Sequence, residues 1–428
     1  MKIVGLITEY NPFHNGHLYH IHESLRITGA DAALVVMSGD YVQRGTPAIM
    51  PKRLRTEMAL YCGAGAVLEL PVCYATGSAE FFALGAISLL DSLGIVDSVC
   101  FGSECSDLPL LQKIAGLLVD EPEQYREILR HELKLGKSFP AARQTAVVFC
   151  TGDPRCADIL KDPNNILGIE YLKALKKCGS SIRPYTIRRK GAGYHSSQLD
   201  GLYSSASAIR SLLAYSSSSI HTEFAGDDST ELSFSDILNE LGNQVPKKCL
   251  ELLSDFHKIQ YPVYQNDFSL ILKYKLLNKH PKSLVRYMDV SPELAARICT
   301  SLNDFFNYKQ FARLLKTKEL TQTRINRALL HIMLGIKKDS VSEYMNSGYN
   351  FYARLLGFRK DCSQILTEIS KKSSLPLLTK LAESRELCEL GQRMLRDDIL
   401  ASNLYTSVVT DKFKTAFLNE YKQRIIKI

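Results

Sequence analysis

The chain has 428 residues, of which 45% are hydrophobic and 23% are charged, and its formal net charge is +8. This describes a soluble globular protein with enough apolar material for two or three domains. The sequence has no apolar run long enough for a membrane span, no secretory signal and no CxxC pair among its eleven cysteines. We therefore expect a cytoplasmic protein with no membrane contact, no disulfide framework and no protein-bound metal site.

Charge is distributed unevenly along the chain. Residues 1–215 carry 22 Lys and Arg against 21 Asp and Glu, residues 216–246 carry six acids and no base, and residues 247–428 carry 31 bases against 18 acids. The net charge of +13 in the last segment favours a polyanionic partner. A helical domain with a solvated, lysine-rich surface would have the same composition.

The first half alternates short apolar runs with helical patterns, which predicts a parallel sheet covered by helices on both faces. The expected strands are Lys2–Ile7, Ala32–Met37, Ala66–Leu70, Ser98–Phe101 and Ile182–Thr186, and the expected helices are His17–Ile27, Lys52–Tyr61, Ser78–Ser92, Leu108–Val119 and Asn165–Lys177. Ligands bind such sheets beyond the carboxyl ends of the strands. Thr8–His17, Ser38–Arg44 and Gly102–Glu104 each follow a strand, so we expect them to surround one pocket.

The first of these loops contains His14-Asn15-Gly16-His17, after an apolar strand and at the start of a helix. Histidines three positions apart share one helical face, and the unpaired amides of a first helical turn attract an anion. Gly16 removes the side chain that would keep a nucleotide away from the backbone. The pattern predicts a phosphate-binding loop, and the alternative is a pair of histidines on an ordinary amphipathic helix.

The second half has a different pattern. Residues 214–232 have the composition of a linker, and we expect a first domain at 1–215, an acidic and serine-rich linker at 216–244 and a basic helical domain at 245–428. Beyond about residue 245 the strand signals fade and apolar residues recur at helical spacing. The expected helices are Val245–Asp255, Phe268–Leu277, Ser283–Tyr287, Pro292–Phe306, Gln310–Lys316, Gln322–Leu334, Asn350–Gly357, Asp361–Ser370, Pro376–Leu390, Gln392–Ser402 and Phe413–Lys427.

A second motif, YSSASAIRS, spans residues 203–211. Ser204 and Ser205 can cap a helix, and Ser207 can donate to a phosphate from the first helical turn. Arg210 lies three residues after Ser207, so both side chains project from one face, and its planar guanidinium can hold phosphate oxygens. Serine-rich helix starts are common, so this motif is specific only together with the histidine pair.

An HxGH element followed later by SSxxxIR resembles the pattern of the nucleotidyltransferase superfamily, whose members join ATP to an acceptor with loss of pyrophosphate. The resemblance implies a Rossmann-like domain with a parallel sheet and in-line attack at the α-phosphorus, without a covalent enzyme intermediate. His14 and His17 would stabilise the growing negative charge. Arg210 and the helix amides, with Ser207 beside them, would hold the departing pyrophosphate, and Mg²⁺ would accompany ATP.

Six further segments narrow the resemblance. They are SGDYVQRGTPAIM at 38–50, KRLRTEMAL at 52–60, ELPVCYATGSAEFFAL at 69–84, FGSE at 101–104, DPNNILGIEYLK at 162–173 and PYTIRRKGAGYHS at 184–196. With them the chain closely resembles the tRNA(Met) cytidine acetate ligase family, densely over residues 1–215 and more loosely beyond. That family is understood to activate acetate with ATP as acetyl-adenylate and to acetylate N4 of the wobble cytidine in elongator tRNA(Met), which implies that the helical half positions the tRNA.

Carried over by position, the resemblance implies an ATP-binding loop made of Ile7, Thr8, Glu9, Tyr10, Asn11, Pro12, Phe13, His14, Asn15, Gly16, His17, Leu18, Tyr19 and His20. Gly102 would lie against the adenine or the ribose, where no side chain fits. Asn164, with Asn165 as the alternative, would contact the nucleotide. Either Arg189 or Arg188 would reach it from the end of a strand.

Several residues have two interpretations. Asp40, Gln43 and Arg44 either border the acetate site, with Arg44 pairing with the carboxylate, or form a structural loop. Lys52 either neutralises phosphates or opens a helix. Glu104 is either a magnesium-linked acid or a helix-start carboxylate, and we favour the second.

Two other functions are compatible with parts of the sequence. A small-molecule adenylyltransferase would need only the first domain, so the +13 half argues against it. A nucleotide-sensing, tRNA-binding protein without catalysis would leave the HxGH and SSASAIR motifs unexplained. In the helical half, Tyr308–Phe311 and Tyr352–Arg354 mix aromatic and basic residues and are candidates for RNA contacts, or else ordinary helix surfaces.

Overall fold

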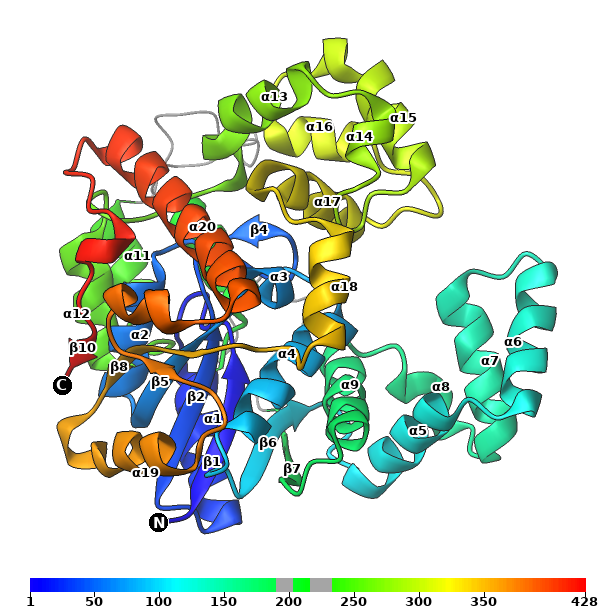
Figure 1. Cartoon of the computed structure of the whole chain (residues 1–428), viewed down its shortest axis with the longest axis horizontal. Coiled ribbons are helices and arrows are strands. Elements are labelled where there is room, and N and C mark those ends of the chain that lie inside the picture. Colours follow the sequence, from blue (N-terminus) through cyan, green and yellow to red (C-terminus); the bar gives the residue numbers. More distant parts are fainter. Residues whose placement is uncertain (190–202, 216–232) are drawn as a thin grey trace.

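The computed structural model describes residues 1–189, 203–215 and 233–428. Its first half alternates strands and helices as predicted (Figure 1). The strands are β1 (Ile3–Thr8), β2 (Ala32–Ser38), β3 (Tyr41–Val42), β4 (Thr46–Pro47), β5 (Ala64–Leu70), β6 (Ser98–Ser103) and β7 (Arg183–Arg188). The helices are α1 (Asn15–Thr28), α2 (Lys52–Tyr61), α3 (Val72–Ala75), α4 (Ala79–Ser92), α5 (Leu108–Asp120), α6 (Glu123–Lys134), α7 (Phe139–Thr151), α8 (Arg155–Ile159), α9 (Pro163–Cys178) and α10 (Ala206–Tyr215).

The parallel part of the main sheet has the spatial order β5-β2-β1-β6-β7. The chain runs from β1 outward to β2 and β5 and then crosses back over β1 to β6 and β7. The strand order therefore reverses between β1 and β6. A crevice opens at the carboxyl ends of two strands at such a point, and ligands bind there.

Successive residues of the central strands pack on opposite faces of the sheet. In β2, Leu34 and Val36 belong to one apolar cluster, whereas Val35 and Met37 belong to the other. Helices α4 and α9 cover the first face, and α1 and α2 cover the second. Because both faces are covered, these strands are apolar throughout, and this is why their sequence signal is clear.

The second half is mostly helical, as predicted. Its helices are α11 (Phe234–Leu241), α12 (Lys247–Phe256), α13 (Ser269–Leu277), α14 (Pro281–Leu284), α15 (Pro292–Thr300), α16 (Tyr308–Leu314), α17 (Gln322–Leu334), α18 (Lys338–Asn346), α19 (Gln364–Lys372) and α20 (Glu389–Phe413). Short 3₁₀ helices are η1 (Gln265–Phe268), η2 (Leu302–Asp304), η3 (Lys360–Cys362), η4 (Leu381–Glu386) and η5 (Glu420–Lys422). Figure 1 shows α13 to α16 as a separate helical group above β4.

The expectation that strands end at about residue 245 is wrong in three places. β8 (Ala353–Phe358), β9 (Leu377–Leu378) and β10 (Ile426–Lys427) join the main sheet, where β8 lies antiparallel to β5 and parallel to β10. The helices predicted at Asn350–Gly357, Pro376–Leu390 and Phe413–Lys427 are therefore wrong. Every residue of β8 is buried, and a short apolar run does not distinguish a central strand from a buried helix.

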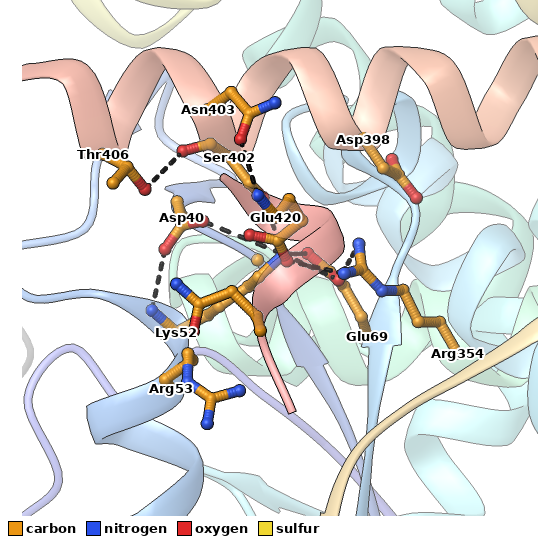
Figure 2. A network of polar contacts seen from close by, with 12 residues as sticks. Asp40, Lys52, Arg53, Glu69, Arg354, Asp398, Ser402, Asn403, Thr406 and Glu420 are labelled. Carbon is orange, nitrogen blue, oxygen red and sulfur yellow. Dashed lines mark hydrogen bonds and ion pairs between the residues drawn. The ribbon is translucent and has the colours of Figure 1, made fainter. Parts of the chain in front are cut away.

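A buried group of charged side chains holds β8 and the C-terminal segment against the sheet (Figure 2). Lys52 Nζ lies 2.7 Å from the carboxylates of both Glu69 and Glu420, and 2.6 Å from Ser402 Oγ. Arg354 Nη1 lies 3.0 Å from Glu69 Oε2, and its Nη2 lies 2.5 Å from Glu420 Oε1. We call Asp40, Lys52, Glu69, Arg354, Ser402 and Glu420 the buried charge network.

The network contains three carboxyl groups and two cations, and both cations lie within hydrogen-bond distance of Glu69 and Glu420. Burial opposes the charge on Glu420, but Lys52 and Arg354 outweigh it and lower the pKa of this carboxyl to about 2. Buried charges persist only where opposite charges and hydrogen bonds compensate them. Glu69 is near the carboxyl end of β5 and Asp40 follows β2, so the network fills this edge of the sheet beside the crevice.

The linker predicted at 216–244 is only partly within the described residues, because 216–232 lie outside them. Residues 234–241 form α11, whose Ile237 and Leu241 are buried, so this part is a packed helix rather than a linker. β8 and β10 show that the two halves share one sheet, and a division of function between 1–215 and 245–428 stays a prediction. Over the described ranges, no helix is both long enough and apolar enough to cross a membrane.

Candidate active site

A cavity of about 250 Å³ lies at the carboxyl ends of β1, β6 and β7. It stands where the strand order reverses, as the topology predicts for a ligand. Of the residues predicted for the site, its wall contains Ile7, Thr8, Glu9, Tyr10, Asn11, His14, Gly16, His17, Tyr19, His20, Gly102, Asn164, Arg189, Ser207 and Arg210. The HxGH motif and the YSSASAIRS motif, which lie far apart in the sequence, therefore meet at one cavity.

Two histidines cap the N-terminus of α1, and the caps fix the orientation of their rings. His14 Nδ1 accepts a hydrogen bond from the backbone N–H of Gly16 at 3.0 Å, and His17 Nδ1 accepts one from the backbone N–H of His14 at 3.3 Å. The ring centroids lie 3.7 Å apart. Because each Nδ1 is an acceptor, the proton of each neutral ring is on Nε2. Both rings are thereby prepared to donate a hydrogen bond through Nε2.

Both rings are neutral at pH 7. Burial, followed by the positive charges of Arg189 and Arg210, lowers the pKa of His14 to about 3. Burial, followed by His14 and Arg189, lowers the pKa of His17 well below its usual value. The histidines therefore supply neutral hydrogen-bond donors, and the arginines supply the positive charge.

Gly16 is required by the position of the His14 ring. A Cβ atom built on Gly16 would lie 2.8 Å from His14 Cε1 and 3.0 Å from His14 Nδ1. A larger residue would therefore displace the ring that caps the helix. This is a second reason for glycine, in addition to the predicted approach of a nucleotide to the backbone.

The YSSASAIRS motif starts α10 at the same cavity. Ser205 Oγ accepts a hydrogen bond from Ala208 N at 3.1 Å, as expected for a helix cap. Arg210 Nη1 donates to the Asn11 carbonyl at 2.6 Å, and its Nη2 donates to Ser207 Oγ at 3.0 Å. Arg210 therefore ties α10 to the loop that precedes α1. The first turns of α1 and α10 both line the cavity, so two helix N-termini favour an anion there.

Gln244 connects the starts of these two helices. Its Oε1 accepts a hydrogen bond from Ser204 N at 3.0 Å, and its carbonyl accepts one from Asn15 N at 2.9 Å. Gln244 is buried, so it fixes the spacing between the two motifs. The sequence does not predict this role, because Gln244 belongs to no motif and lies in the segment expected to be a linker.

A third group of predicted residues gathers at the ends of β6 and β7. Arg189 Nη1 donates to Asn164 Oδ1 at 3.0 Å, and both side chains line the cavity. Asn165 is buried, and its Oδ1 accepts from the backbone N–H of Glu104 at 2.9 Å. Arg188 is exposed at the end of β7 and is absent from the cavity wall within the described residues. The sequence leaves open the choice between Asn164 and Asn165 and between Arg188 and Arg189. Asn164 and Arg189 are the ones that line the cavity.

Glu104 is a helix-start carboxylate, as we favoured. Its Oε2 accepts from Asn165 N at 2.9 Å and its Oε1 accepts from Asn164 Nδ2 at 2.5 Å, in the first turn of α9. Gly102 leaves room for Arg189, because a Cβ atom on Gly102 would lie 3.2 Å from Arg189 Cγ. The end of β6 thus orients the side chains of Asn164 and Arg189 at this side of the cavity.

The β3–β4 hairpin brings Gln43, Arg44 and Thr46 to the cavity wall. The backbone N–H of Gln43 donates to Glu9 Oε1 at 3.0 Å, which joins the hairpin to the loop after β1. From α2, the buried guanidinium of Arg55 donates to carbonyls in the loops after β1 and β2, at Glu9, Ser38 and Gly39. Gln43 and Arg44 thus border the cavity, whereas their part in binding acetate stays a prediction.

Asp40 and Lys52 belong to the buried charge network rather than to the cavity wall (Figure 2). Asp40 Oδ1 accepts from the backbone N–H of Lys52 at 2.7 Å. Lys52 opens α2, and its Nζ contacts Glu69 and Glu420. Of the two interpretations of each residue, the structural one fits these contacts: Asp40 lies in a structural loop and Lys52 starts a helix.

Four of the residues predicted at 7–20 lie off the cavity wall. Pro12, Phe13, Asn15 and Leu18 do not line the cavity. The Phe13 ring is buried 4.7 Å from the Tyr10 ring, Asn15 Nδ2 donates to the Asn243 carbonyl at 2.8 Å, and Leu18 packs against an apolar cluster. Contact of these four residues with the nucleotide stays a prediction, whereas the other ten residues of 7–20 line the cavity.

Apolar and aromatic residues that the sequence does not predict complete the wall: Phe82, Phe101, Leu167, Tyr171, Ile187 and Tyr203. Leu167 and Tyr171 follow Asn164 by three and seven positions, so all three share one face of α9. That spacing is the signal that points to them. Phe82 has no such signal, because it is one of many apolar residues of α4.

This arrangement suits a nucleotide with a polyphosphate chain. The N-terminus of α10, two neutral imidazole donors and the guanidiniums of Arg189 and Arg210 can bind phosphate oxygens, and the dipole of α1 adds to the positive potential. The aromatic and apolar wall can receive a base. Within the described parts of the chain, no group of three or more His, Cys, Asp or Glu residues is arranged to hold a metal ion.

Comparisons with known proteins agree with this geometry. A family model described as HIGH Nucleotidyl Transferase matches residues 1–420. The chain is 43% identical over 407 residues to the tRNA(Met) cytidine acetate ligase of Caldanaerobacter subterraneus subsp. tengcongensis, with 95% of each chain covered. It is 40% identical over 429 residues to the enzyme of the same name from Acetivibrio thermocellus, with all of both chains covered.

Two crystal structures of Thermotoga maritima TmcAL are similar to this one over all of both chains at 31% identity. The apo form gives a TM-score of 0.89, and the form bound with alpha-thio ATP gives 0.88. The predicted α/β nucleotidyltransferase fold is confirmed by this similarity. The chain therefore belongs to the HIGH nucleotidyltransferase family and, within it, to the tRNA(Met) cytidine acetate ligases.

Proposed function

We propose that this enzyme activates acetate with ATP as acetyl-adenylate and transfers the acetyl group to N4 of the wobble cytidine of elongator tRNA(Met), giving N4-acetylcytidine. The observation that carries the proposal is the meeting of His14, His17 and Arg210 at one cavity, where a triphosphate can contact both motifs. The names of the relatives and the alpha-thio ATP bound to one structural neighbour support it.

In the first step, a carboxylate oxygen of acetate attacks the α-phosphorus of ATP in line with the departing pyrophosphate. A bond forms between acetate and phosphorus, and the bond from the α-phosphorus to the bridging oxygen breaks with its electron pair. His14 and His17 donate through Nε2 to the phosphate oxygens as negative charge grows there. Ser207, Arg210 and the amides at the start of α10 hold the pyrophosphate.

The other predicted ATP contacts that line the cavity complete the substrate site. Gly102, Asn164 and Arg189 lie together at the ends of β6 and β7, where the adenosine can be held. Mg²⁺ would accompany the phosphates and neutralise their charge. Glu9 lines the cavity and would be the carboxylate available to such an ion, since Mg²⁺ usually takes one or two carboxylates together with phosphate oxygens.

In the second step, N4 of the cytidine attacks the carbonyl carbon of the mixed anhydride. The new C–N bond forms as the bond from carbon to the adenylate oxygen breaks, AMP leaves, and the N4 proton passes to solvent. The exocyclic amine is a weak nucleophile, and this explains the need for ATP. Proteins read RNA bases mainly in unpaired loops, so an anticodon base suits this reaction. Such a reaction takes place in the cytoplasm, where we place the protein.

The experiment is acetate-dependent exchange of pyrophosphate into ATP, followed by mass spectrometry of nucleosides from unmodified elongator tRNA(Met). We expect exchange with acetate and N4-acetylcytidine after tRNA is added, and Arg210→Ala should weaken ATP binding and turnover together. No acetylcytidine with active protein would contradict the proposal. An adenylylated small metabolite formed without RNA would instead support the alternative of a small-molecule adenylyltransferase.

A further inference from the structure

Helix α13 is apolar on two sides but covered on only one. Leu272 and Leu276 are buried, whereas Leu270, Tyr274 and Leu277 are 80%, 70% and 60% exposed. These three lie at positions i, i+4 and i+7, so they form one stripe along the helix. An apolar stripe along a helix normally packs against another element. Among the residues that the structure describes, nothing covers this stripe of α13.

Phe306 is a further exposed apolar residue near α13. It is 81% exposed, and Phe305 and Tyr308, which are close to it in sequence, are hydrogen-bonded to α13. Lys273 Nζ donates to the Phe305 carbonyl at 3.2 Å, and Tyr308 N donates to Ser269 Oγ at 3.0 Å. These bonds hold Phe306 beside the first half of α13. We call Leu270, Tyr274, Leu277 and Phe306 the α13 surface.

The α13 surface belongs to a basic lobe, residues 265–320, which contains ten Lys and Arg against five Asp and Glu. Two of these acids are paired with bases outside the lobe, Asp267 with Lys412 and Asp289 with Arg327, each at 2.8 Å. These pairs attach the lobe to the rest of the protein. Three acids then remain against ten bases, and such a surface complements a polyanion.

The lobe begins beside the candidate active site. The ring of Phe268, the last residue before α13, lies 5.8 Å from the ring of Tyr41 in β3. Tyr41 is two residues before Gln43, which lines the cavity. In the turn of the hairpin, Gly45 has φ +74°, and a Cβ atom there would clash with the backbone nitrogen of Arg327. The lobe and α17 are thus packed on the hairpin that borders the cavity.

We infer that the α13 surface binds unpaired bases of the RNA substrate, and that the lysines and arginines around it contact the phosphates. This inference rests on the proposed function, because it concerns the same substrate. Aromatic rings that stack on bases, set in a positively charged surface, are typical of single-stranded RNA recognition. A second copy of the chain is a poorer occupant, since a symmetric contact would bring two basic lobes together.

The aromatic clusters suggested by the sequence are unsuitable for this role. Tyr308 and Phe311 are buried in the lobe, and Tyr352 and Arg354 are buried in and around the charge network. Their side chains cannot stack on a base without unfolding. Tyr274 and Phe306 are in no sequence motif, and only their exposure identifies them.

The experiment compares the full-length protein with its Tyr274→Ala/Phe306→Ala double variant, using unmodified elongator tRNA(Met) as the probe. The loss of two stacking rings should raise the KM for tRNA in acetyl transfer by about 10-fold or more. Acetate-dependent pyrophosphate exchange, which needs no RNA, should be unchanged. Phe149→Ala is the matched control, because Phe149 is 62% exposed on α7, outside the lobe, and it should alter neither measurement.

An unchanged tRNA affinity in the double variant, measured by fluorescence anisotropy, would overturn the inference. A wild-type dimer that the double variant converts to monomers, with unchanged tRNA affinity, would overturn it in favour of a second copy. If the wild type catalyses neither exchange nor acetyl transfer, the proposed function fails, and the anisotropy measurement still decides whether this surface binds RNA.

Discussion

The cavity and the buried charge network are two polar regions at the same edge of one sheet. In the network, Lys52 and Arg354 face Glu69 and Glu420 within hydrogen-bond distance, and the charges compensate one another. In the cavity wall, by contrast, the histidines are neutral and the guanidiniums outnumber the carboxylates. The cations of the network are paired with carboxylates of the protein, whereas the described residues of the cavity wall contain more cations than carboxylates.

This difference teaches how to separate structural from functional polar residues in an α/β fold. A buried charge that is matched by the protein holds elements together. A set of donors that converge on an open cavity can be satisfied by an anionic ligand. The sequence shows only residue types, so Lys52 and Arg210 are both phosphate-binding candidates until their partners are known.

The largest effect should come from breaking the network. Lys52→Met leaves Glu69 and Glu420 with one cation fewer in a buried position, and loss of one partner of a buried pair costs about 3–5 kcal/mol. The free energy of urea unfolding should fall by that amount. Lys248→Met is the control: its pair with Glu251 at 2.9 Å is exposed and screened by solvent, so the free energy of unfolding should stay nearly unchanged. Equal losses would contradict the comparison.

Substitution of a histidine in the cavity should reduce catalysis rather than stability. His17→Ala removes the Nε2 donor that we propose for the α-phosphate, and acetate-dependent pyrophosphate exchange should fall about 100- to 1,000-fold. The variant should still bind tRNA, since the α13 surface is intact. His22→Ala changes an exposed histidine of the same helix and should keep full exchange. Comparable exchange by the two variants would show that His17 has no role in the reaction.

A smaller effect should distinguish two neighbouring arginines. Arg189 lines the cavity and donates to Asn164, while Arg188 is exposed outside it. Loss of hydrogen bonds from a charged group in Arg189→Ala should raise the KM for ATP by about 10- to 100-fold, and Arg188→Ala should leave it unchanged. Steady-state kinetics of exchange measures both. A larger effect from Arg188 would reverse the assignment.

Over any single pH unit, the smallest effect is the pH dependence of stability. The pKa of His14 is about 3 in the folded protein, against about 6.5 when unfolded. Only the unfolded chain takes up a proton between these values, so the stability that is present above pH 6.5 is lost as the pH falls toward 3. The slope should reach about 1.4 kcal/mol per pH unit for this histidine.

Urea unfolding at a series of pH values measures this slope, and His14→Asn is the variant that tests it. Asparagine is a good N-cap, so the bond to Gly16 N can be retained while the titrating ring is removed. The variant should lose stability less steeply than the wild type as the pH falls. An identical slope in the two proteins would show that His14 is not the titrating group.

The parts of the fold that could be predicted are those with local signals. β2 is apolar because it is covered on both faces, and the His14–His17 spacing places two rings on one helical face. The position of the cavity follows from strand order alone. These features depend on residues that are close in the sequence or on general rules of topology.

The parts that could not be predicted depend on distant partners. Arg354 in β8 is buried because Glu69 and Glu420 neutralise it, and nothing in its neighbourhood in the sequence indicates a strand. Gln244 and Arg55 act through hydrogen bonds to backbone groups of other segments. Such bonds require no side-chain motif in the partner, so sequence patterns give no sign of them.

The pairing of β5 with β8 has a consequence during translation. β5 ends at Leu70, but its neighbour on that side begins at Ala353. While the ribosome makes the intervening chain, the backbone groups along one side of β5 have no strand to pair with, and unpaired strand edges recruit other chains and promote aggregation. We therefore expect the nascent protein to need protection from aggregation until residues 353–358 emerge.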